Sequence, residues 1–122
     1  MKDVDLARNM LVVGVRTTGF MHMVQRIFNV KELPAKASWL YHCFVWVVGE
    51  TLYVAGINTA KIEFYKITWF TGKFNTVDWV LSMKKDKELV DGPCMKFENI
   101  NGFMDWVKTH ECTSTLVKTL ND

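Results

Sequence analysis

The hydrophobic pattern of this chain predicts a mixture of helices and strands. Residues 10–15 form a continuous apolar run, which favours a buried strand. Apolar side chains then recur every three or four positions over residues 19–28, which predicts a helix with one apolar face. Pro34 falls in a turn-like stretch over residues 31–38, where we expect a loop.

Two strands joined by a tight turn are predicted next. Residues 41–48 are rich in aromatic and β-branched side chains, which are typical of a strand. Gly49 and Glu50 suit a two-residue turn, with glycine at the position that a type II′ hairpin requires. Residues 51–55 then return as the partner strand.

Further strand signals follow this hairpin. Asn58 and Thr59 mark a second turn, and the alternation over residues 62–67 predicts a third strand. Residues 77–83 are a fourth strand candidate, ended by the charged residues 84–88.

The last third of the chain favours two short helices. A turn is expected at residues 91–93, and Asn101 is suited to cap a helix that begins directly after it. A final helix is expected to begin near Cys112 and to carry Leu116, Val117 and Leu120. One long helix over residues 102–121 is the alternative, but polar His110 and Thr113 interrupt its apolar stripe, so we favour a break near residues 109–110.

Composition is consistent with one α+β domain over residues 1–122. The chain has 49% hydrophobic and 23% charged residues, which is ordinary for a globular protein and argues against disorder. A length of 122 residues is enough for one domain and too short for two. The formal net charge of +2 is far below that of a typical nucleic-acid binder, so we expect no nucleic-acid partner.

The expected location is the cytoplasm. Three cysteines form no visible disulfide framework, which suits a reducing compartment. Residues 1–5 lack the pattern of a signal peptide, and no apolar run approaches the roughly 18 residues of a membrane helix. We therefore expect no membrane span.

The candidate chemistry lies in His42 and Cys112. A thiol at a helix start beside an imidazole would have a lowered pKa, and the thiolate is the reactive form. Successive strand residues point to opposite faces, so Cys43 is expected in the core while His42 faces a cleft. No Cys-x-x-Cys or His-x-x-x-His pair and no glycine-rich phosphate loop is present, so neither a metal nor a cofactor is expected.

Aromatic residues around His42 are candidates for lining the cleft. These are Trp39, Tyr41 and Trp46, although core packing also accounts for Trp46. Asn58 is the candidate for orienting the imidazole through its second nitrogen, and its alternative role is that of an ordinary turn residue.

The order of elements, with a His-bearing strand before a late cysteine, resembles the permuted papain-like cysteine hydrolases, particularly small phage-encoded members. Residues 111–118 are similar to the cysteine helix of that family, and His42 to its base. The resemblance implies an antiparallel sheet of about four to six strands packed against a C-terminal helix bearing Cys112 and an N-terminal helix. Gly56 departs from the pattern, because a polar side chain that orients the imidazole is common there.

Two functions of different classes follow. The first is a hydrolase or amidase in which Cys112 attacks an amide or ester carbonyl, with a peptide, peptidoglycan-like or acyl-amide substrate. The second is a non-catalytic, phage- or virion-associated binding module with the same fold and a protein partner. An inhibitor or regulator of a host protein is also compatible with the size and charge. The location would be the host cytoplasm or a virion, and the oligomeric state is left open.

Overall fold

The computed structural model describes most of the chain, namely residues 2–13, 18–31, 37–40, 43–48, 51–69, 99–109 and 112–122. These residues form α1 (Asp3–Val13), α2 (Thr18–Phe28), β1 (Ala37–Leu40), β2 (Cys43–Val48), β3 (Thr51–Asn58), β4 (Lys61–Trp69), α4 (Ile100–Lys108) and β5 (Cys112–Asn121). The predicted α+β class is therefore confirmed.

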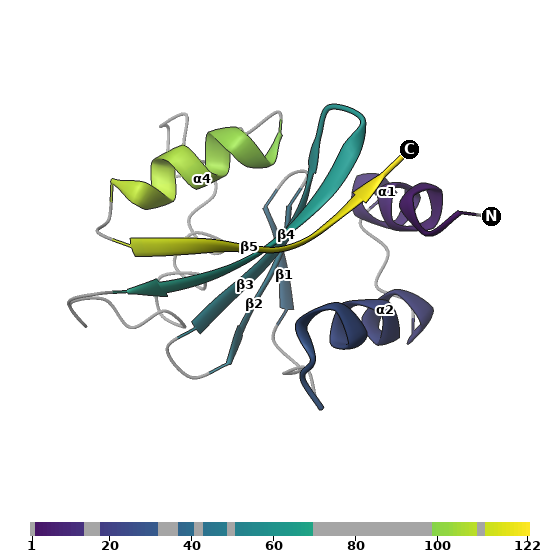
Figure 1. Ribbon diagram of the computed structural model, residues 1–122, viewed down its shortest axis with the longest axis horizontal. Helices are drawn as coiled ribbons and strands as arrows, with labels where there is room; N and C mark the ends of the chain where they lie inside the picture. Colours follow the sequence, from purple (N-terminus) through teal and green to yellow (C-terminus); the bar gives the residue numbers. More distant parts are fainter. Residues whose placement is uncertain are drawn as a thin grey trace.

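The five strands form one antiparallel sheet in the order β1-β2-β3-β4-β5, so each strand lies beside the strand that follows it in the chain (Figure 1). The β3–β4 hairpin pairs Asn58 with Lys61 and therefore closes through a two-residue turn. Thr59 opens this turn with a φ of 58°, a left-handed conformation that is uncommon for a β-branched residue. The predicted turn at Asn58 and Thr59 and the predicted strand over residues 62–67 are confirmed.

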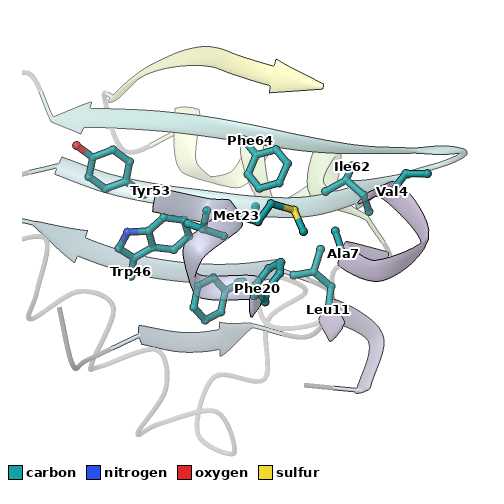
Figure 2. Packing of buried hydrophobic residues seen from close by; sticks show 12 residues of the cluster. Val4, Ala7, Leu11, Phe20, Met23, Trp46, Tyr53, Ile62 and Phe64 are labelled. Atoms are coloured by element: carbon teal, nitrogen blue, oxygen red, sulfur yellow. The ribbon is translucent and has the colours of Figure 1, made fainter. Parts of the chain in front are cut away.

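Helices cover both faces of the sheet, and we call these the α1/α2 face and the α4 face (Figure 1). The α1/α2 face carries a cluster of buried side chains (Figure 2). Its fully or nearly buried members are Val4, Ala7, Leu11, Phe20, Met23, Val24, Phe44, Trp46, Tyr53, Ala55, Ile62 and Phe64. The partly buried Phe28 of α2 contacts Trp46, Tyr53 and Phe64 edge-on, with ring centroids 4.9–5.8 Å apart.

On the α4 face, the sheet and the helix approach very closely. The buried residues of α4 are Ile100, Phe103, Met104 and Val107, at the spacing of one helical face. A Cβ added to Gly56 of β3 would lie 2.8 Å from both Cβ and Cδ1 of Ile100. Glycine at this position therefore lets α4 pack directly on the strand.

Both ends of α4 lie close to their predicted places. The side chain of Asn99 caps the helix, because its Oδ1 accepts the backbone N–H of Gly102 at 3.2 Å. The cap is thus two residues earlier than the predicted Asn101. The helix ends at Lys108, which agrees with the predicted break near residues 109–110.

The helix predicted over residues 19–28 is confirmed as α2, while the strand predicted over residues 10–15 is wrong. Its first four residues belong to α1, which buries Val4, Ala7 and Leu11 at helical spacing. Asp3 and Asp5 in the first turn also favour this helix, because carboxylates interact well with a helix N-terminus.

The predicted helix after Cys112 is also wrong, as is the single long helix over residues 102–121. The segment is strand β5, in which β-branched Thr113, Thr115, Val117 and Thr119 alternate with other residues. The loop predicted over residues 31–38 is too long at its end, because residues 37 and 38 belong to β1. Residues 32–36 of that loop lie outside the described residues, as do the turn at 49–50, the strand over 77–83 and the turn at 91–93.

Candidate functional site

Cys112 lies at the start of strand β5, opposite Trp69 of β4. It is half-buried, and desolvation raises its pKa to about 11. A strand does not provide the dipole that a helix N-terminus offers to a thiolate. At neutral pH the Cys112 side chain is therefore held as the thiol, which is the unreactive form.

The predicted partners His42 and Tyr41 lie outside the described residues. Cys43, which follows His42 in the chain, begins β2 and lies in one row of the sheet with Gly56 and Glu63. Cys112 lies three strands away and six residues further along β4, which separates the two Cα atoms by about 24 Å at ordinary sheet spacings. The predicted hydrolase requires the His42 ring within hydrogen-bond reach of Cys112 Sγ, and this pairing stays a prediction.

The two cysteines that the structure describes share one property. Cys43 is fully buried, as predicted for a core thiol, and desolvation raises its pKa to about 12. Neither thiol therefore has the lowered pKa of a nucleophilic cysteine.

Asn58 lies at the end of β3, where its side chain belongs to a polar cluster. Its Nδ2 donates to Oε1 of Glu63 at 3.0 Å and to Oδ1 of Asn101 at 3.3 Å. Its Oδ1 accepts the hydroxyl of Thr59 at 3.1 Å. Both amide protons of Asn58 thus have partners that link the β3–β4 hairpin to the first turn of α4. Position 56, where the resemblance would place a polar side chain, is a glycine, and the Ile100 side chain occupies the space beside it.

The centre of this cluster is the Glu63 carboxylate, which sequence reasoning missed. Glu63 is 4% exposed, and its Oε2 accepts the Tyr65 hydroxyl at 2.6 Å. Its Oε1 also lies 3.3 Å from Nζ of Lys61. A signal was present, because residues 61, 63 and 65 lie on one face of a predicted strand.

The ionisation of this cluster is fixed at neutral pH. Burial by itself raises the pKa of Glu63, but hydrogen bonds from Tyr65, Asn58 and Lys61, together with the Lys61 charge, hold it below its usual value. Desolvation and the neighbouring carboxylate raise the pKa of Tyr65 to about 12. The cluster thus holds a permanent anion with satisfied oxygens, which suits a structural tie better than proton transfer.

The aromatic residues proposed to line a cleft have different positions. Trp46 is fully buried, stacks on Tyr53 with ring centroids 5.7 Å apart and contacts Phe44 at 4.9 Å. Trp46 is therefore a core residue, which was the predicted alternative to lining the cleft. Trp39 lies in β1 opposite Phe44.

Two open depressions occur on the described surface, and neither is lined by Cys112. One, of about 780 Å³, is lined by Lys2, Asp5, Arg8 and Asp122. Another, of about 570 Å³, is lined by His22, Gln25, Arg26, Asn29 and Val30. Among the described residues no three His, Cys, Asp or Glu side chains gather as metal ligands would, and no helix could cross a membrane.

The edge strand β5 presents the main apolar surface of the described residues. Leu116 is 51% and Val117 39% exposed, whereas the only other large exposed apolar side chain described is Val12 at the end of α1. Within the part of the sheet that the structure describes, β5 pairs with β4 on one side only. Lys118 is its one charged residue. Among the described residues, this strand edge thus carries exposed apolar side chains and pairs with one strand only.

No protein-family model, curated protein or solved structure matches this chain. The resemblance to permuted papain-like hydrolases therefore stays a prediction.

Proposed function

We propose that this protein is a non-catalytic binding module that pairs an extended protein segment with the edge of β5. The observation that carries the proposal is the exposed centre of that strand, where Leu116 and Val117 lie on an edge that pairs with β4 alone among the described strands. Such an edge is a template for adding a strand from another polypeptide.

The energetics of this mode suit the residues of β5. Backbone N–H and C=O groups of the partner would supply most of the affinity, since β5 offers few charges for recognition. Burial of Leu116 and Val117 under partner side chains would add a hydrophobic contribution of roughly 1 kcal/mol for each half-exposed side chain. Thr113, Ser114 and Thr115 leave the rest of the edge polar.

The states of the ionisable groups also favour binding over catalysis. The Cys112 thiol has a raised pKa, and the Glu63 carboxylate already receives donors from three side chains. The Cys112–His42 hydrolase stays a prediction, and the alkylation experiment in the Discussion tests it.

Selection of random ten-residue peptides against the wild-type protein would test the proposal. We expect the selected peptides to bind Leu116→Lys and Val117→Lys at least tenfold more weakly, because a charge replaces the apolar contact. Val12→Lys is the matched control, because Val12 has a similar exposure on α1 and should leave binding unchanged. Failure to select any peptide with a protein sample that sediments as a monomer, or equal binding by all three variants, would overturn the proposal.

A further inference from the structure

Strand β5 contains a one-residue bulge at its centre. Its first half pairs with β4 from Trp69↔Cys112 to Tyr65↔Leu116, and its second half resumes at Phe64↔Lys118. Val117 is therefore an extra residue that has no opposite position in β4. The bulge falls in the middle of a strand of 10 residues, with five residues on each side of the Leu116–Val117 bond.

The bulge changes which face each half of β5 presents. Directly opposite residues of an antiparallel pair point to the same face of the sheet. Cys112 and Ser114 lie opposite Trp69 and Ile67 on the α4 face.

Beyond the bulge, the odd-numbered residues of β5 lie on the α4 face. Thr119 and Asn121 lie opposite Glu63 and Lys61, again on the α4 face. By the same reasoning Thr113, Thr115, Lys118 and Leu120 lie on the α1/α2 face. On the α4 face, the first half of β5 thus presents even-numbered residues and the second half odd-numbered ones. The α1/α2 face has the reverse order.

This change of face at the bulge lets β5 pair with β5 of a second copy over its full length. If two copies pair antiparallel along the whole strand, a two-fold axis passes between Leu116 and Val117. Such an axis places Cys112 opposite Asn121, Thr113 opposite Leu120, Ser114 opposite Thr119 and Thr115 opposite Lys118. In a regular strand these pairs would point to opposite faces, so the axis would have to pass through a residue and would leave one end residue unpaired. Because of the bulge, every one of these pairs shares a face.

We propose that β5 pairs with β5 of a second copy of this chain, so that one antiparallel sheet runs through both copies of a two-fold dimer. The inference rests on the proposed function and names the partner. Full overlap of the two strands would form about ten backbone hydrogen bonds, the number of a typical protein interface. A contact of this kind, with the same surface on both partners, closes into a dimer.

The side chains of β5 fit this partner. Leu116 and Val117 of each copy meet at the axis, where the exposed apolar surface is largest. Lys118, the one charged side chain of the strand, faces Thr115 of the other copy, so no like charges oppose each other.

A disulfide trap tests the register directly. The Asn121→Cys variant, in a Cys94→Ser background, should form a covalent dimer on treatment with diamide, which takes up the two electrons and two protons of the thiol pair. Cys112 and position 121 lie at opposite ends of one strand, about 30 Å apart, so they cannot bridge within one chain. Thr115→Cys in the same background is the control, because it lies far from Cys112 of either copy.

The charge pattern provides a second test, by sedimentation equilibrium over a range of concentrations. Thr115→Glu should tighten the dimer roughly fivefold, because it faces Lys118 of the other copy twice. Thr115→Lys should weaken it by a similar factor. Lys66 of β4 lies opposite position 115 of β5 in the same chain. Because that contact is the same in monomer and dimer, it does not change the dimerisation constant.

Two results would overturn the inference. One is an Asn121→Cys protein that cross-links no faster than the Thr115→Cys control, and the other is a wild-type mass that stays monomeric at every concentration. If selected peptides still bind β5 in that case, only self-pairing is wrong, and the edge remains a binding surface. If the peptides fail as well, the proposed function is also wrong.

Discussion

Strands β3 and β5 belong to one sheet and have very different surroundings. β3 has strands on both sides and helices on both faces, and residues 52–56 are buried without interruption. β5 has one described neighbour, and residues 115–118 are exposed. The buried stretch of β3 is apolar apart from the Tyr53 hydroxyl, while the exposed stretch of β5 consists of Thr115, Leu116, Val117 and Lys118. The difference indicates that the centre of the sheet provides most of the stability of the fold, while the exposed centre of β5 contributes little to it.

The largest contrast should come from truncating one side chain in each region. Trp46→Ala in β2 should lower the free energy of unfolding by about 4 kcal/mol, because it empties the centre of the aromatic cluster. Val117→Ala in β5 should change it by less than about 0.5 kcal/mol in the monomer. Urea titrations at low protein concentration measure both, and equal losses would contradict the contrast.

The first residue of β5 gives the next largest effect. With a pKa of about 11, Cys112 should react with iodoacetamide at pH 7 roughly a hundredfold more slowly than an ordinary exposed cysteine. The rate should rise with pH up to about 11, and mass spectrometry separates this site from Cys43 and Cys94. Rapid alkylation near neutral pH that slows in His42→Ala would instead support the hydrolase.

A substitution on β3 examines the contact that fixes α4. Gly56→Ala should lower the free energy of unfolding by about 2–3 kcal/mol, because the new methyl group would overlap Ile100. Thr115→Ala on β5 is the matched control and should have almost no effect. Thermal or urea unfolding of both proteins gives the comparison, and a stable Gly56→Ala protein would show that α4 can shift away from the sheet.

A smaller, pH-dependent effect is expected from the polar cluster. The folded-state pKa of Glu63 is lowered, so its contribution is complete above the unfolded pKa of about 4.5 and is lost as the pH falls through the folded value. Glu63→Gln should therefore cost about 2 kcal/mol at pH 7 and much less in acid.

Tyr65→Phe is the companion variant for this cluster. It removes one hydrogen bond from the carboxylate and should cost about 1 kcal/mol at pH 7. Unfolding measured from pH 7 to pH 3 tests both variants. A Glu63→Gln protein that loses the same stability at every pH would contradict the expected titration.

The centre of the sheet was predictable from the sequence and its ends were not. Local alternation and turn residues identified α2 and strands β2 to β4, because those signals lie within short windows. Residues 10–15 were misjudged because a continuous apolar run fits a buried helix as well as a strand. Burial of Leu11 in the cluster on the α1/α2 face decides in favour of the helix. For β5, the spacing of Leu116, Val117 and Leu120 suits a helix equally well.

The candidate site was harder to predict. The Glu63 cluster depends on the register of β3 with β4 and on the position of α4, which no local pattern encodes. The bulge at Val117 depends on pairing with β4 and is equally hidden. The assignments of Cys112 and Asn58 rest on short local motifs, and such motifs carry no information about either feature. His42 lies outside the described residues.

The left-handed Thr59 has a consequence for engineering. Its β-branched side chain is costly at a φ of 58°, so the turn between β3 and β4 contributes less than such turns usually do. Thr59→Asn would suit this conformation better, although it gives up the hydroxyl contact with Asn58. Natural variation at this hairpin tip therefore has room to make the protein more heat-resistant without touching its edge.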